Sequence, residues 1–84
     1  MKFQLAVNLE RMDNSIEMED VKNHTLDMVQ MADQGGFNIV WAAEHHAIEM
    51  TIAPNPFQIL TWWANHTDRI RLGTAVVNAA YWHP

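Results

Sequence analysis

The chain of 84 residues contains no cysteine, so its own side chains offer neither a disulfide framework nor a thiolate site. Small free-standing domains usually rely on disulfides or a metal, because a chain of this size buries only about 60–70% of its unfolded surface. Yet 49% of the residues are hydrophobic and four are tryptophan. We therefore expect further protein, either the rest of a larger domain or a second chain, to pack against it.

Basic residues are scarce: five Lys and Arg stand against ten Asp and Glu, which gives a formal net charge of −5. Binding to a phosphate backbone needs clustered Lys and Arg, so the composition argues against a nucleic-acid partner. The one close basic pair is Arg69 and Arg71, which would share a face on a strand. We interpret it as a solvated strand entry rather than an anion site.

Long apolar runs are also missing. The first eight residues lack the hydrophobic stretch of a signal peptide, and no segment has the length needed to span a bilayer. Together with the lack of cysteine, these features predict a cytoplasmic protein with no membrane partner.

Hydrophobic periodicity predicts two elements in the first half of the chain. Alternating side chains favour a strand at about residues 2–8. A helix at about residues 18–34 follows, with Ser15 and the acids after it suited to its start and two glycines suited to its end. One helical face gathers Met18, Val21, Thr25, Met28 and Ala32, with Val29 beside them.

Three further elements follow. Residues 37–43 are nearly all apolar, which favours a strand buried on both faces. Asn55 and Pro56 are typical of an N-cap and first helical residue, and they predict a helix at about residues 56–66. Its apolar stripe comprises Phe57, Leu60, Thr61 and Ala64, while Trp62 and Trp63 are expected to pack. Residues 70–77 form the last predicted strand.

The order β-α-β-α-β requires parallel strands with right-handed crossovers. Three such strands leave two open edges and an uncovered apolar face, so we expect more barrel or self-association to cover them. His83 and Pro84 resemble a helix about to begin.

Catalytic groups of parallel α/β folds gather at the carboxyl ends of the strands. The end of the second strand carries Glu44, His45 and His46. Because neighbouring strand residues point to opposite faces, His45 and His46 would not chelate one ion, and Glu44 with His46 gives too few ligands for zinc. We expect no metal site. A histidine here could exchange a proton near neutral pH, or the group could be a surface or helix-cap cluster.

The third strand contains Gly73 in its middle, a position where the backbone often bulges or something approaches closely. With Thr74 and Ala75 it could form a flat shelf for a planar ligand. On this segment alone, close packing inside a barrel is the favoured interpretation.

Taken together, the chain resembles the N-terminal part of the bacterial-luciferase-like flavin-dependent monooxygenases. The matching segments come in order along nearly the whole chain: Met1-Lys2-Phe3, Gly36 to Trp41, Glu44-His45-His46, Asn55-Pro56, Arg69 to Val76 and His83-Pro84. The resemblance implies the first part of a (β/α)8 TIM barrel of roughly 250 residues or more, incomplete in this chain.

The resemblance also implies reduced FMN supplied by a flavin reductase, and dioxygen that oxygenates a small organic substrate. It implies acid–base work for His45, support from Glu44 and His46, and cofactor contacts at Ala75, Val76 and Asn78. The peptide between Ala75 and Val76 matches a non-prolyl cis peptide common in the family. Asn78 departs from the apolar residue usual there, and residues 78–82 depart from luciferase itself, which argues against light emission.

Two alternatives stay open. A branch of the same barrel family uses a deazaflavin and transfers hydride. The 84-residue chain could instead be inactive, with poor flavin binding, and persist only as a homo-oligomer.

Overall fold

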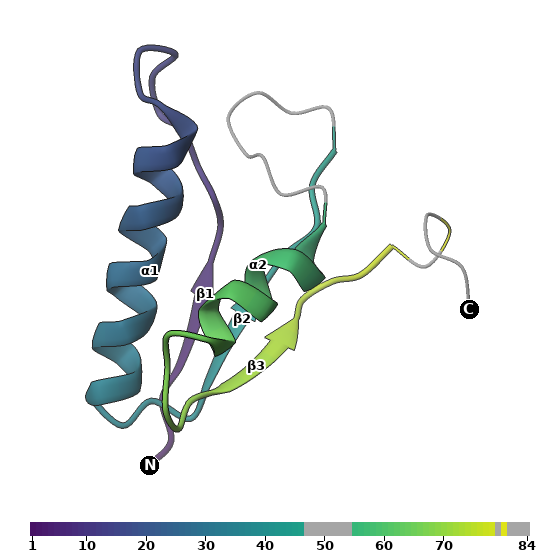
Figure 1. Cartoon of the computed structure of the whole chain (residues 1–84). Coiled ribbons are helices and arrows are strands. Elements are labelled where there is room, and N and C mark those ends of the chain that lie inside the picture. The colour runs from purple at the N-terminus through teal and green to yellow at the C-terminus, as the bar shows by residue number, and fades with distance from the viewer. Residues whose placement is uncertain (47–54, 79, 81–84) are drawn as a thin grey trace.

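The structure, a computed structural model, describes residues 1–46, 55–78 and 80. Five elements follow one another along the chain (Figure 1): β1 (Gln4–Val7), α1 (Met18–Gln34), β2 (Ile39–Ala42), α2 (Pro56–Ala64) and β3 (Arg71–Thr74). The strands form one parallel sheet in the order β1-β2-β3. The predicted α/β class and β-α-β-α-β order are confirmed.

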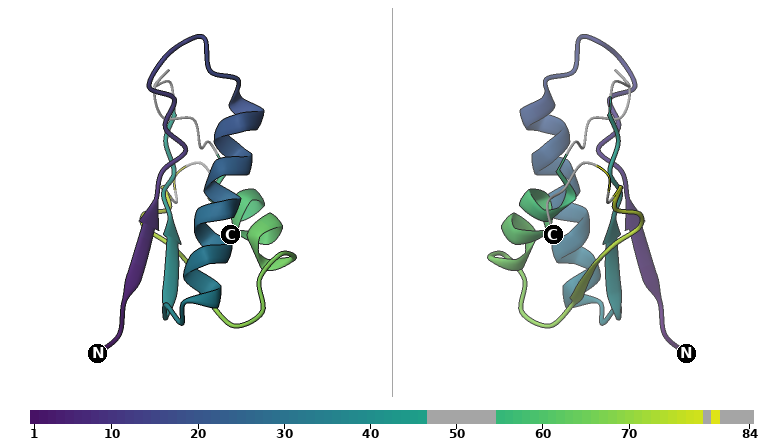
Figure 2. Two further views of the ribbon diagram at one scale, coloured as in Figure 1. Left: turned by 90° about the vertical axis from the view of Figure 1, so that its left-hand side faces the viewer. Right: turned by 90° about the vertical axis from the view of Figure 1, so that its right-hand side faces the viewer.

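Both helices cover the same face of the sheet (Figure 2). This follows from two successive crossovers of the same hand, each of which places its helix on one side. In β2, Val40 and Ala42 are buried beneath the helices, while Ile39 and Trp41 are only half-buried on the other face. The prediction that residues 37–43 are buried on both faces is therefore wrong for this chain.

The core lies between the sheet and the two helices. It comprises Val7, Val29, Ala32, Val40, Ala42, Leu60, Trp63 and Ile70. Trp63 has no exposed surface, which confirms its packing role. The predicted stripe of α2 is mostly wrong, because the helix is turned to bury the large indole of Trp63 together with Pro56 and Leu60. Phe57, Thr61 and Ala64 are exposed instead.

Helix α1 spans the predicted range, but it begins differently from the prediction. Glu17 is its N-cap residue and provides no side-chain cap, whereas Ser15 lies in the preceding turn, where its N–H bonds to Asp13 Oδ1 at 2.8 Å. The buried face is Val21, Thr25, Val29 and Ala32, and Met28 is 37% exposed. At the other end Gly36 adopts a φ of +82°, which suits a glycine after a helix.

The strands are shorter than the predicted ranges because their pairing stops. Ala42 pairs with Thr74, and the Ala75 N–H donates to the Ala42 carbonyl at 2.8 Å as the last link between β2 and β3. Helix α2 ends at Ala64, two residues before the predicted end, and Asn65 is its C-cap. Within the described ranges, no helix is both long and apolar enough to cross a membrane.

Candidate functional site

The segments that follow β2 and β3 leave the sheet at the same edge. Parallel pairing in register, with Ala42 opposite Thr74, makes this unavoidable. The predicted neighbourhood of residues 44–46 and 75–78 is therefore present. Helix α2 also begins at this edge, where the Asn55 side chain accepts from the N–H groups of Phe57 at 3.1 Å and Gln58 at 3.3 Å. The predicted N-cap is confirmed.

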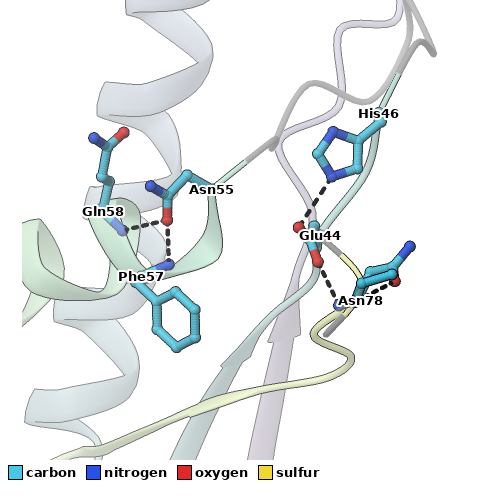
Figure 3. A network of polar contacts seen from close by, with 7 residues as sticks. Glu44, His46, Asn55, Phe57, Gln58 and Asn78 are labelled. Atoms are coloured by element: carbon cyan, nitrogen blue, oxygen red, sulfur yellow. Dashed lines mark hydrogen bonds and ion pairs between the residues drawn. The ribbon is translucent and has the colours of Figure 1, made fainter. Parts of the chain in front are cut away.

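Glu44 connects the two segments (Figure 3). One carboxylate oxygen, Oε1, lies 3.0 Å from His46 Nε2, and the other, Oε2, accepts from the Asn78 backbone N–H at 2.5 Å. Its side chain is only 1% exposed. A buried carboxylate needs such partners, because taking a charge out of water is costly unless it is paired and hydrogen-bonded. Glu44 thus fixes the chain after β3 to the end of β2.

The two histidines differ in their surroundings, as alternating side-chain directions predict. His46, two residues after Glu44, lies on the same side as the carboxylate, with its side chain 35% exposed. His45 is half-buried and takes part in neither Glu44 contact. The acidic and basic groups therefore form one pair, Glu44 with His46, beside a separate imidazole.

Asn78 contributes through its backbone and its side chain. While its N–H bonds to Glu44, its Oδ1 accepts from the Ala80 N–H at 3.3 Å. Between this anchor and β3 lie Ala75 and Val76, joined by a cis peptide at the position that the family resemblance implied. Val76 is 74% exposed. A small apolar surface thus lies next to the buried carboxylate.

The shelf expected at Gly73 is occupied by the chain's own Trp41. The two residues pair across the sheet, and a Cβ on Gly73 would lie 2.5 Å from Cζ3 of the indole. The indole Nε1 donates to Gln4 Oε1 at 2.9 Å, so the ring lies across all three strands. The close-packing interpretation is right for Gly73, and only Ala75 and Val76 remain as an open surface.

The described part of the chain contains no cluster of three or more His, Asp or Glu side chains that could hold a metal ion. His66 lies just after the end of α2, where its Nδ1 is 2.8 Å from the Trp62 carbonyl. That position is far along the chain from the Glu44 pair and belongs to helix packing.

The sequence analysis missed the bond from Glu44 to the Asn78 backbone. Its one available signal was that Glu44 is the first charged residue after a buried strand. Period-two alternation places Glu44 and His46 on the same side of the chain, but it did not lead us to predict their contact, and nothing in the sequence gives the path of the chain after Ala75, on which the Asn78 bond depends.

Comparison with known proteins gives the family context of this geometry. The profile of the luciferase-like monooxygenase family matches residues 1–84. The oxygenase component of the flavin-dependent trigonelline monooxygenase of Acinetobacter baylyi is 42% identical over 84 residues, which is 100% of this chain and 23% of that protein. The chain thus spans about a quarter of the length of this curated relative.

Two solved structures share the fold. Apo-MsnO8 superposes with a TM-score of 0.89 at 23% identity, covering 96% of this chain and 24% of that one. The oxygenating constituent of 3,6-diketocamphane monooxygenase from Pseudomonas putida, solved in complex with FMN, gives 0.78 at 18% identity, covering 88% of this chain and 20% of that one.

Proposed function

Because the chain belongs to the luciferase-like monooxygenase family, we propose that it is part of a flavin-dependent monooxygenase acting on a small organic substrate. Reduced FMN, when bound, supplies the electrons with which dioxygen is activated for insertion of one oxygen atom. A relative that is the oxygenase component of a flavin-dependent system supports delivery of the reduced flavin by a separate reductase.

The observation that carries this proposal is the buried Glu44 carboxylate between His46 and the Asn78 backbone. It holds the loop after β3 at a fixed distance from the histidines after β2. Such preorganisation is what a catalytic edge needs, because reacting groups held in place avoid reorganisation during the reaction.

The open surface fits one face of a flavin ring. Ala75 and Val76 are exposed and apolar, so they match a flat, largely apolar ring system, while Asn78 offers polar groups for the ring edge. We assign ring contact to Ala75 and Val76 and an orienting role to Asn78.

His45 is assigned the proton transfer. It is half-buried on the same edge, and near neutral pH an imidazole can take up a proton and its protonated form can release one. His46 and Glu44 act as positioning residues, because their pairing fixes the backbone on both sides of His45.

The proposal is tested in the complete protein by anaerobic titration with reduced FMN and by product formation. We expect Glu44→Gln to weaken flavin binding about tenfold, since the amide loses the charged bond to His46. His45→Gln should bind flavin normally yet lower kcat by about 100-fold or more. Trigonelline is the first substrate to try, given the relative that acts on it.

His66→Gln serves as the matched control, because the His66 imidazole bonds to the Trp62 carbonyl and packs against the Trp62 ring, and its loss is expected to leave both measurements unchanged. Unchanged flavin binding in Glu44→Gln and unchanged kcat in His45→Gln would together defeat the site assignment. Binding of a deazaflavin in place of FMN would instead place the protein in the hydride-transferring branch.

A further inference from the structure

A second cleft lies at the opposite edge of the sheet from Glu44. It has a volume of about 340 Å³. Its lining comes from the N-terminal residues before Phe3, the turn after α1 and the connection into β3. In Figure 1 this is the lower end of the molecule, where the N-terminus lies beside the connections into β2 and β3. None of the residues assigned to flavin or proton transfer lines it.

Positive charge is concentrated in this cleft. The chain has five Lys and Arg in all, and three of them, Lys2, Arg69 and Arg71, line this one cavity. The chain as a whole carries a net charge of −5. A local cluster of cations in an acidic protein repels itself and is therefore a feature that needs an explanation.

No carboxylate of the described residues forms an ion pair with these three cations. Asp33, the one acid that lines the cleft, directs its oxygens to the main chain instead. Its Oδ2 accepts from the N–H of Asp68 at 2.8 Å, and its Oδ1 accepts from Arg69 at 2.9 Å and Ile70 at 2.8 Å. Arg69 acts on this carboxylate through its charge, but no side-chain donor of the three cations forms an ion pair with a carboxylate of the described residues.

The same bonds hold the backbone that carries the arginines. Asp33 fixes residues 68–70, and the Arg71 N–H donates to the Asn38 carbonyl at 3.1 Å. On the other side of the cleft, the Asn38 N–H donates to the Phe3 carbonyl at 2.8 Å and so fixes the residue that follows Lys2. Because this backbone is already fixed, a ligand that binds in the cleft loses less free energy to ordering the loops around it.

We propose that this cleft binds the phosphate group of a small molecule, in place of the solvated strand entry that the sequence alone favoured for Arg69 and Arg71. Arginine matches phosphate with two parallel N–H bonds, and a lysine adds a point charge. The cavity is in the size range of small-molecule sites, and three cations are too few for a polyanion. Free inorganic phosphate and the phosphate of an organic ester share this chemistry, and the test distinguishes them.

The test titrates the complete, ¹⁵N-labelled protein with inorganic phosphate at constant ionic strength and follows the amide signals of Gly36, Asn38 and Arg71. We expect chemical-shift changes that saturate with phosphate concentration. The dissociation constant obtained from them should be about tenfold higher in Arg71→Gln. Lys2→Gln, which lies ahead of β1, provides a second variant should Arg71→Gln fail to fold. Lys22→Gln removes the same charge outside the cleft and should bind as the unaltered protein does.

A repeat with ribose 5-phosphate identifies the source of the phosphate. Tighter binding of the ester supports an organic ligand, and equal binding supports inorganic phosphate. Shifts that fail to saturate, or that are the same in Arg71→Gln and Lys2→Gln as in Lys22→Gln, overturn the proposal. So does an equal loss of reduced-FMN binding in the cleft variants, because it would make this cleft part of the flavin site.

Discussion

The indole ring of Trp41 leaves no room for a side chain at position 73 of β3, so a glycine is required there. A Cβ there would lie 2.5 Å from one ring carbon and 2.7 Å from another. Both distances are shorter than any stable carbon–carbon contact, so the ring would have to move and release its bond to Gln4. One glycine thus keeps an aromatic ring flat on the face of the sheet that the helices leave uncovered.

Gly73→Ala is expected to destabilise the protein by about 1–3 kcal/mol, the usual range for overpacking a fitted site. Urea unfolding measures the loss. Combining it with Trp41→Leu, which removes the ring, should cost less than the sum of the two single changes. Strictly additive losses would show that the two residues do not oppose each other.

Some single-residue roles could be predicted from the sequence and others could not. Asn55 before Pro56 is a local signal, since an N-cap acts within its own helix turn, and it was predicted correctly. The three backbone bonds of Asp33 join residues 35 to 37 positions apart. Their formation depends on how α1 and the connection into β3 meet, which no local pattern encodes.

At the scale of elements, the two helices differ in how they begin. Helix α2 has a side-chain cap from Asn55, whereas Glu17 at the start of α1 provides none. The longer helix α1 has 17 residues and four buried side chains that hold it against the sheet. The nine-residue α2 has fewer turns and depends more on its cap.

Asn55→Ala should therefore lower the free energy of unfolding by about 1 kcal/mol, because two backbone N–H groups lose their acceptor. Thermal unfolding followed by circular dichroism measures it. Ser15→Ala is the comparison: this residue suited a cap by sequence but lies before the helix, so its cost should stay within about 0.5 kcal/mol. An equal loss of unfolding free energy in Asn55→Ala and Ser15→Ala would contradict the assignment of Asn55, and not Ser15, as a helix cap.

The exposed side of α2 shows where periodicity fails. Apolar residues fill most of this helix, so two stripes have helical spacing: one through Phe57 and Ala64, the other through Pro56 and Trp63. Only packing selects between them, and it selects the stripe with the larger buried ring. Helix α1 has one apolar stripe, and there the prediction was right except at Met28, which is exposed, and Met18, which is only half-buried.

At the scale of the whole molecule, Asp33 joins the end of α1 to the connection between α2 and β3. The Asp68 backbone N–H, followed by those of Arg69 and Ile70 and by the charge of Arg69, lowers the pKa of Asp33 below its ordinary 3.8, although burial opposes this. The ionised Asp33 therefore stabilises the folded protein fully at pH values above the pKa that Asp33 has in the unfolded chain. This stabilisation is lost as the pH falls through the lower pKa of the folded protein.

Asp33→Asn should destabilise the protein at pH 7 by about 1 kcal/mol, a reduced value because the carboxylate is only partly buried and solvent screens its charge. The difference in unfolding free energy from the unaltered protein should narrow as the pH falls below 3.8, because the unfolded chain takes up the proton first and the folded carboxylate follows at its lower pKa. Urea unfolding across this range measures it. Asp27→Asn removes an exposed carboxylate from the same helix; a similar profile in that variant would refute the role of the three bonds.

Trp41 and Trp63 lie on opposite faces of the same three strands, one half-exposed on the uncovered face and the other fully enclosed by the helices. Two of the four tryptophans therefore report on opposite faces of the sheet, and a variant with Trp62→Phe and Trp82→Phe isolates their emission. Quenching of Trp41 by iodide reports whether a ligand or another part of the protein lies against the face of the sheet opposite the helices. In that variant the emission of Trp63 reports separation of the helices from the sheet, so ligand occupancy and unfolding can be followed in one sample without an added label.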